Sequence, residues 1–475
     1  MINEKIKIIC CILILGIILL CWGIQLPYTK AWETGALEIF AQNHLRYGFA
    51  LTRAVPVVNL IDGTPNYYRS HPPLVPILIA LSFKMFGIHE WSARLVPIIF
   101  SLLELLFFYL LIEFISGKRT ALFSSIVMIF LPMFNYYGRI VNYESVTLGI
   151  TVAFLYFFFK FVYTQKKMYL VFLLSVALLG MMSDWPFLLI FPALLPVILY
   201  KRSSFKIYLT LILLAFIIPV GIILYFNRVT EVPALIQFYS FLSRCQYKNI
   251  LSDGGFYQVL TKRLILNFTP IGCLFLLVWF FMVLRKKLIR NEKINLVATI
   301  LLIFGFSLVC IAPQAAYIHV WALQYLAPAI ALITALVMLQ LKKQLRLFCF
   351  SVFVIFSLLY FAKLHLVRFD GCYEAAKLLP AVVSPKHILY TNAISPINFY
   401  SSLESHYFSV GVKQDGVPED FIQNKSPAYV CFIMYAHEPS FDHSKLTEIL
   451  FRKRYKIIYN QKGIELWSCY NNSSN

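Results

Sequence analysis

The sequence predicts an all-α polytopic membrane domain followed by a small C-terminal domain of α/β or α+β type. Three observations lead to this prediction. Hydrophobic residues make up 60% of the 475-residue chain and charged residues only 13%, and the mean hydropathy is +0.73, which is typical of a multi-pass membrane protein. Apolar runs of bilayer-spanning length recur from residue 7 to residue 365. After residue 365 the composition becomes that of a soluble domain.

About eleven apolar runs are expected to cross the membrane as helices. They lie at about 7–26, 92–115, 120–137, 143–163, 168–183, 186–200, 207–226, 265–284, 294–312, 320–340 and 347–365. A further run, 72–88, is about 17 residues long, opens with two prolines and carries Lys84, so we expect it to lie along the membrane surface. The runs 168–183 and 186–200 are short, and a kinked pair around Asp184-Trp185-Pro186 is an alternative to two separate spans.

The charge distribution orients this topology. The chain has 42 basic and 22 acidic residues, a net charge of +20, and the basic residues cluster between apolar runs as the positive-inside rule expects. This placement argues against nucleic-acid binding. If 72–88 stays outside the bilayer, the short cytoplasmic loops contain fifteen Lys and Arg, whereas the short external turns contain only Arg139. We therefore expect a cytoplasmic N-terminus and an external C-terminus.

This topology divides the chain into a transmembrane domain, 1–365, and an external domain, 366–475. Two external loops, 27–91 and 227–264, stand out by length. The first is aromatic and amphipathic, which predicts interfacial helices. In 366–475 the residue patterns predict one helix and four strands. The helix is expected at Tyr373–Leu379, and the strands at His387–Asn392, Tyr429–Tyr435, Tyr455–Tyr459 and Ile464–Cys469.

Two acidic residues near the external face are candidate catalytic groups, because an ionisable group at membrane depth is costly and is usually paired or functional. Glu33 follows the first span by a few residues, and Glu144 stands at the external start of the span 143–163. One belongs to a long loop and the other to a short turn, so they can converge on one external cavity. The alternatives are that Glu33 is an interfacial acid near Lys30, and that Glu144 stabilises a helix N-terminus and pairs with Arg139.

Three motifs near the N-terminus carry a resemblance to a known family. They are Asn43-His44-Leu45-Arg46-Tyr47-Gly48, His71-Pro72-Pro73-Leu74, and Phe86-Gly87 with Glu90-Trp91-Ser92-Ala93-Arg94-Leu95. In order and spacing they resemble the dolichyl-phosphate-mannose-type glycosyltransferases. These polyprenyl-phosphate-dependent enzymes of the C-type fold include protein O-mannosyltransferases and the aminoarabinose transferase of lipid A. The resemblance is good over about residues 28–200 and loose beyond, and it also implies that 72–88 is an external interfacial helix.

The resemblance assigns roles to individual residues. In that family an acidic residue just after the first span acts as the catalytic base, and Glu33 matches this position; many members have Asp there, and Glu38 is the fallback. A second family acid follows an Arg at the next external turn, as Glu144 follows Arg139. Some members place a Lys before the Pro in the loop, where it meets the lipid phosphate. This sequence departs from them, because His71 takes that position.

The implied reaction is hexosyl or pentosyl transfer from a polyprenyl-phosphate-linked sugar to an acceptor that is a lipid, a glycan or a protein. Such a reaction needs cations that neutralise the leaving phosphate and a carboxylate that accepts the hydroxyl proton. The candidate substrate-binding residues are Arg69, His71, Arg139, Arg244, Lys248, Lys262, Arg263 and His319. The alternative for the arginines, the lysines and His71 is that they are anchors for lipid headgroups; the alternative for His319 is that it is a hydrogen-bonded residue in the wall of the cavity. Arg139 is the strongest candidate, because it is the lone positive charge in a short external turn.

No cofactor is expected, because no glycine-rich phosphate loop and no cluster with metal-ligand spacing is present. The sequence does not decide whether a divalent metal bridges Glu33 and Glu144. It also does not decide whether two of Cys372, Cys431 and Cys469 form a disulfide. The main alternative function is a polytopic transporter or lipid flippase, which would show inverted repeats or charges near mid-span. The ionisable residues instead collect at one face beside a long loop, which favours an enzyme over a transporter. A scaffold that binds partners through its tail would leave loop 27–91 without a role.

Overall fold

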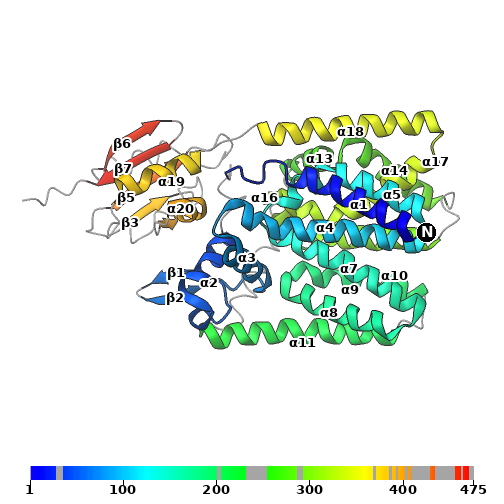
Figure 1. The fold of residues 1–475 in the computed structure, drawn as a ribbon, viewed down its shortest axis with the longest axis horizontal. Coiled ribbons are helices and arrows are strands. Elements are labelled where there is room, and N and C mark those ends of the chain that lie inside the picture. Colours follow the sequence, from blue (N-terminus) through cyan, green and yellow to red (C-terminus); the bar gives the residue numbers. More distant parts are fainter. Residues whose placement is uncertain are drawn as a thin grey trace, which may run out of the picture.

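The computed structural model describes residues 2–27, 36–61, 63–200, 205–231, 254–285, 292–366, 371–383, 388–391, 394–401, 405–407, 428–433, 455–461 and 464–469. Long helices run side by side in a bundle, and all the strands labelled in Figure 1 lie beyond one end of it. We call this the loop end; it carries α2 (Ala36–Thr52), β1 (Val57–Ile61), β2 (Thr64–Tyr67) and α3 (Leu74–Phe86). The N-terminus lies at the opposite end (Figure 1).

The bundle consists of long helices joined by short turns. The long helices are α1 (Ile2–Leu20), α4 (Glu90–Ser116), α5 (Lys118–Phe130), α7 (Tyr143–Thr164), α8 (Lys167–Ser183), α11 (Phe205–Thr230), α13 (Gly254–Phe268), α14 (Pro270–Leu284), α15 (Glu292–Ile311), α17 (Ala327–Gln340) and α18 (Lys343–Leu366). The short ones are α6 (Pro132–Asn135), η1 (Tyr137–Arg139), η2 (Trp185–Leu189), α9 (Ile190–Ala193), α10 (Leu195–Tyr200), α16 (Pro313–Ile318) and η4 (Val320–Leu326). Gly117 alone separates α4 from α5, with a φ of +87° that a residue with a side chain rarely adopts.

Six helical units in the described part of the chain are long and apolar enough to cross a membrane: α4, α7, α11, α15, α18, and η4 with α17. Two bent pairs raise the number to eight if each is one span. They are α5 with α6–η1, bent by 66°, and α13 with α14, bent by 102°. The chain is therefore an integral multi-pass membrane protein. The 13 residues of α3 extend only about 20 Å, which is shorter than the roughly 30 Å of a bilayer's hydrocarbon core.

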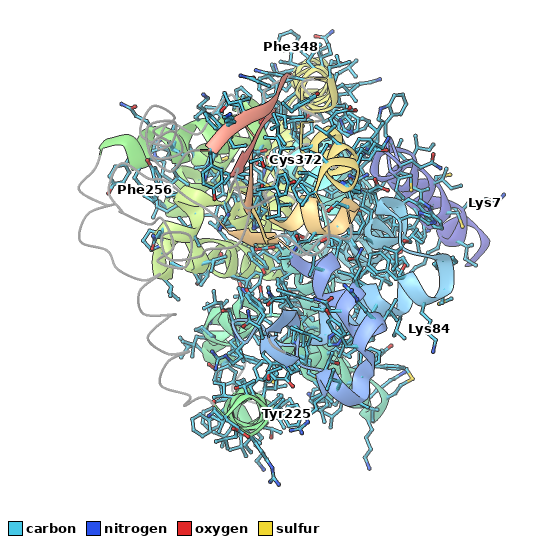
Figure 2. The ribbon with its side chains drawn as sticks, turned by 90° about the vertical axis from the view of Figure 1, so that its left-hand side faces the viewer. Lys7, Lys84, Tyr225, Phe256, Phe348 and Cys372 are labelled. Atoms are coloured by element: carbon cyan, nitrogen blue, oxygen red, sulfur yellow. The ribbon has the colours of Figure 1, made fainter. Side chains whose placement is uncertain are left out.

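Burial separates the central helices from the peripheral ones. In the most apolar stretch of the η4–α17 unit 94% of the residues are buried, whereas the corresponding shares in α11 and α18 are 11% and 17%. These two helices lie along opposite edges of the bundle (Figure 1). In the end-on view of Figure 2, Phe348 of α18 lies at the outer edge of the molecule. Apolar side chains of both helices are exposed, as expected of surfaces that face lipid.

The loop between α1 and α4 contains a β hairpin as well as helices. Strands β1 and β2 pair antiparallel, with Ile61 opposite Thr64, and the side-chain amide of Asn43 on α2 donates to the carbonyls of Val57 and Val58 at 2.9 Å. The expectation of interfacial helices alone was therefore incomplete for this loop. The sequence Asp62-Gly63 between the two strands is a hairpin turn signature, and it is the signal that could have revealed them.

The C-terminal residues form a five-stranded mixed sheet with the strand order β4-β3-β5-β7-β6. The elements are α19 (Gly371–Val382), β3 (Ile388–Thr391), α20 (Ile394–Ser401), β4 (Ser405–Tyr407), β5 (Ala428–Ile433), β6 (Tyr455–Gln461) and β7 (Ile464–Cys469). The sheet and α19 enclose a second hydrophobic core that includes Cys372 and Cys431. Burial, and secondarily the nearby Cys372 thiol, raises the pKa of Cys431 to about 12. Cys372 and Cys431 are both thiols in the structure, and the side chain of Cys469 lies outside the described residues.

Candidate functional site at the loop end of the bundle

The break between α8 and η2 places Asp184 at the loop end. Asp184 is extended, with φ −162°, and its Oδ1 accepts a hydrogen bond from the backbone N–H of Trp185 at 2.8 Å. The chain can turn here because Gly180 has no side chain: a Cβ at Gly180 would lie 2.4 Å from the ring of Phe187. The apolar run is thus divided into α8 and the η2–α10 segment. Asp184 itself is only 2% exposed.

Asp184 and Trp185 bind the segment that precedes α3. Nδ1 of His71 lies 2.7 Å from Oδ1 of Asp184, and Nε1 of Trp185 donates to the carbonyl of Ser70 at 2.7 Å. Two hydrogen bonds therefore join residues 70–71 to residues 184–185. The sequence indicated His71 as a candidate and treated Asp184 only as part of a kink, so the structure adds Asp184 to the candidate site.

Aromatic rings stack on both sides of this contact. The imidazole of His71 lies nearly parallel to the ring of Tyr143, with centroids 4.3 Å apart, and to the ring of Tyr68 at 5.9 Å. Tyr68 in turn stacks on Phe40 of α2 at 4.7 Å. The stack connects α2, the residues after β2 and the first turn of α7. It holds the imidazole plane in one orientation.

Glu144 lies beside this stack, as the second residue of α7. The helix begins here because the side chain of Asn142 accepts a hydrogen bond from the backbone N–H of Ser145. Gln324 of η4 then donates to Oγ of Ser145 at 3.0 Å, which ties η4 to the same turn. Glu144 and Asp184 are close enough to repel each other electrostatically. His71, Glu144 and Asp184 thus form one polar cluster with Tyr143.

Arg139, the strongest of the candidate cations, contacts the chain just after α1. Its Nη1 donates to the carbonyl of Trp22, and its guanidinium lies 5.3 Å from the ring centre of Tyr136. Arg94 donates to the carbonyls of Ile24 and Leu26 at 2.6 Å. Both arginines are buried, and both bind the chain just after α1. Within the described residues Glu144 has no ion-pair partner, so the alternative that it pairs with Arg139 is wrong.

The other candidate cations are dispersed. Arg69 contacts Thr230 at the end of α11 at 3.5 Å, and Arg263 on α13 donates to the carbonyl of Ala316 at 2.6 Å. Lys262 is exposed on α13, and the ring of His319 stacks on Trp321. Three candidates, namely Glu33, Arg244 and Lys248, lie outside the described residues. Glu38, the fallback for Glu33, is fully buried in α2.

No group of three or more His, Cys, Asp or Glu side chains in the described ranges is arranged to bind a metal ion. A metal that bridges Glu33 and Glu144 would involve a residue outside those ranges. The described cluster contains two carboxylates, which can accept a proton. It also contains one imidazole and tyrosine hydroxyls, which can donate hydrogen bonds to an anion.

Comparisons with known proteins bear on the family and the fold of the chain. Residues 70–225 match the family model described as dolichyl-phosphate-mannose-protein mannosyltransferase, a range that includes His71, Glu144 and Asp184. No curated protein sequence matches the chain. The resemblance that the N-terminal motifs indicated is confirmed by this match together with the solved structures of similar fold.

Two solved structures illustrate the similarity of fold. The crystal structure of ArnT from Cupriavidus metallidurans bound to undecaprenyl phosphate has a TM-score of 0.69 at 13% identity, over 99% of this chain and 98% of that chain. The oligosaccharyltransferase AglB from Archaeoglobus fulgidus, in complex with an inhibitory peptide and a dolichol-phosphate, has a TM-score of 0.55 at 11% identity, over 84% of this chain and 64% of that chain. At this level of identity the likeness is one of fold.

Proposed function

We propose that this chain, which combines a family match to dolichyl-phosphate-mannose-type transferases with the fold of ArnT, is an integral membrane glycosyltransferase. It moves a sugar from a polyprenyl-phosphate donor to an acceptor hydroxyl. The observation that carries the proposal is the cluster of His71, Asp184, Tyr143 and Glu144 at the loop end of the bundle. There a lipid-linked substrate can reach the site from the membrane, and a water-soluble acceptor can reach it from outside.

The chemistry follows from the bonds that change. The bond between the anomeric carbon and the phosphate oxygen breaks, the acceptor oxygen bonds to that carbon, and the polyprenyl phosphate leaves as an anion. A carboxylate must take the hydroxyl proton, and we assign this role to Glu33, with Glu144 orienting the acceptor beside the stack. A cation must stabilise the departing phosphate, and His71 is the candidate cation that the described cluster contains.

Topology and location belong to the same proposal. The six long apolar units and the two bent pairs account for eight crossings. Three more apolar segments, namely α1, α8 and Trp185–Leu199, bring the number to eleven, which supports the expected eleven-span arrangement. On this topology α3 lies along the membrane surface, with Leu81, Met85 and Phe86 exposed for lipid contact. The loop end and the C-terminal sheet face the outside of a bacterial inner membrane. Residues 1–365 form the transmembrane domain and 366–475 the external domain.

A lipid flippase is the second candidate, and one observation favours it. Glu104 is fully buried in the middle of α4, and both of its carboxylate oxygens lack a hydrogen-bond partner among the described residues. An ionisable residue at this depth is often part of a transport pathway. The two candidates differ in their products, since a flippase moves a lipid across the bilayer and leaves its sugar attached.

The test is sugar transfer by the full-length protein in lipid nanodiscs, with a panel of radiolabelled undecaprenyl-phosphate hexoses and pentoses and with extracted membrane lipids, glycans and proteins as acceptors. We expect one donor to yield a labelled acceptor. Glu33→Gln should lower the rate about 10²–10⁴-fold, because a general base is typically worth that much. Glu144→Gln should lower it by a smaller factor.

The matched control is Glu113→Gln, which removes an acid that pairs with Lys5 at the opposite end of the bundle and should leave transfer near wild type. The absence of transfer from every donor, combined with movement of an intact lipid-linked sugar across liposome membranes, would refute the enzyme and establish the flippase. Near-normal transfer by folded Glu33→Gln would reassign the base to Glu144 or Glu38.

A further inference from the structure

The contact between Asp184 and His71 determines which ring nitrogen is available to a ligand. An ionised carboxylate only accepts hydrogen bonds, so the proton shared across 2.7 Å belongs to Nδ1 of His71. Asp184 is buried, whereas the side chain of His71 is 22% exposed. Nε2 is thus the nitrogen left to meet a ligand, and it can donate to an anion only when the ring carries both protons.

The groups around the imidazole attract positive charge. The carboxylate of Asp184 lies at one edge of the ring, and the parallel rings of Tyr143 and Tyr68 present electron-rich faces to it. A cation is attracted by such faces. A purely mechanical tie between the same two segments is already provided by the neutral hydrogen bond from Trp185 to Ser70. The charged pair beside it therefore has a further role.

We propose that Asp184 is a positioning residue that holds His71 as an imidazolium, with Nε2–H directed at the phosphate of a polyprenyl-phosphate ligand. The inference rests on the proposed function for the identity of the ligand. It adds a residue that lies 113 positions from its partner and outside the N-terminal motifs. Asp184 acts only through His71. A side chain at position 71 that carries its own permanent charge should therefore make Asp184 unnecessary.

The test is direct binding of undecaprenyl phosphate to the full-length protein in nanodiscs, with undecaprenol as the phosphate-free control. The variants are Asp184→Asn, His71→Lys, the double variant, and Glu113→Gln as the control at the opposite end of the bundle. We expect Asp184→Asn to weaken undecaprenyl phosphate binding about tenfold, because a charge-assisted hydrogen bond to the phosphate is lost, and to leave undecaprenol binding unchanged. The double variant should bind as tightly as His71→Lys alone.

Three outcomes would overturn the proposal. The first is that Asp184→Asn weakens the binding of undecaprenyl phosphate and of undecaprenol equally. The second is that the double variant binds undecaprenyl phosphate a further tenfold more weakly than His71→Lys does. The third is that Asp184→Asn binds undecaprenyl phosphate as tightly as the wild type. If Asp184→Asn does not fold, His71→Gln and His71→Lys decide the question, since the neutral side chain must lose phosphate binding and the charged one must keep it. Binding that follows this pattern without any sugar transfer would contradict the proposed function and leave this inference intact.

Discussion

Arg94 and Arg139 fix the end of α1 with charge-assisted hydrogen bonds to backbone carbonyls. Together they bind the carbonyls of Trp22, Ile24 and Leu26. These residues lead directly into the segment that contains Glu33. Two buried cations are thus used to position backbone. A positive charge near a predicted active site is therefore not sufficient to identify a substrate ligand.

Arg94→Gln tests this positioning role. The variant removes a buried donor to two carbonyls, so we expect a loss of about 1.5–3 kcal/mol in the free energy of unfolding. The catalytic rate should fall, while the affinity for undecaprenyl phosphate should stay near wild type. The measurements are chemical unfolding and steady-state transfer. Arg46→Gln, which alters an exposed arginine of α2, should leave both quantities unchanged; a loss of lipid affinity in Arg94→Gln would instead make Arg94 a ligand.

At the scale of elements, close packing of α4 against α7 positions Glu144. Gly149 on α7 lies against the backbone of α4, and a Cβ at this position would come within 2.4 Å of the carbonyl oxygen of Phe100. Backbone atoms cannot rotate away as a flexible side chain can. The contact therefore requires glycine. It fixes the position of the first turn of α7, and so of Glu144, relative to Asp184.

Gly149→Ala should consequently destabilise the protein by about 1–3 kcal/mol through overpacking, and it should lower transfer by displacing Glu144. Gly221→Ala in α11 is the matched control, since a Cβ there meets no atom within 4 Å. That change should be neutral or stabilise the helix by up to about 1 kcal/mol. Unfolding of both variants in nanodiscs measures the difference. Equal stability of the two would show that the α4–α7 contact is not rigid.

Elements were predictable from the sequence to different degrees. The helix α19 and the strands β3, β5, β6 and β7 were predicted nearly in place, because alternating apolar residues mark a strand that is buried on one face. The hairpin β1–β2 was missed, because Pro56 and Pro65 interrupt the alternation. The link from His71 to Asp184 could not be predicted, because hydrogen bonds between distant segments leave no periodic pattern in a sequence.

At the scale of the whole molecule, both ends of the bundle carry polar links. At the N-terminal end Lys5 contacts Glu113 at 2.5 Å and Lys118 contacts Glu4 at 3.0 Å, so α1 is joined to α4 and α5. At the loop end the polar cluster joins α3, α7 and α8. The apolar runs predicted a multi-pass protein but could not show which helices are central, since α11 is as hydrophobic as α4.

Sidedness is testable at this scale. In a cysteine-free background, Lys118→Cys should be labelled by a membrane-impermeant maleimide only after the membrane is opened, whereas Thr64→Cys should be labelled in intact cells. The expectation follows from the excess of Lys and Arg in the loops that share a side with position 118. Labelling of position 118 in intact cells would reverse the orientation and would place His71 and Glu144 in the cytoplasm.

The polar links in the first 184 residues also have a consequence for the order of synthesis. Glu4 waits for Lys118, Trp22 for Arg139 and His71 for Asp184, across 114, 117 and 113 positions. At about 5–20 residues per second, each early partner spends roughly 6–23 seconds in the insertion machinery before its counterpart emerges from the ribosome. A nascent chain that stalls before residue 184 therefore presents an imidazole whose carboxylate partner has not yet been synthesised.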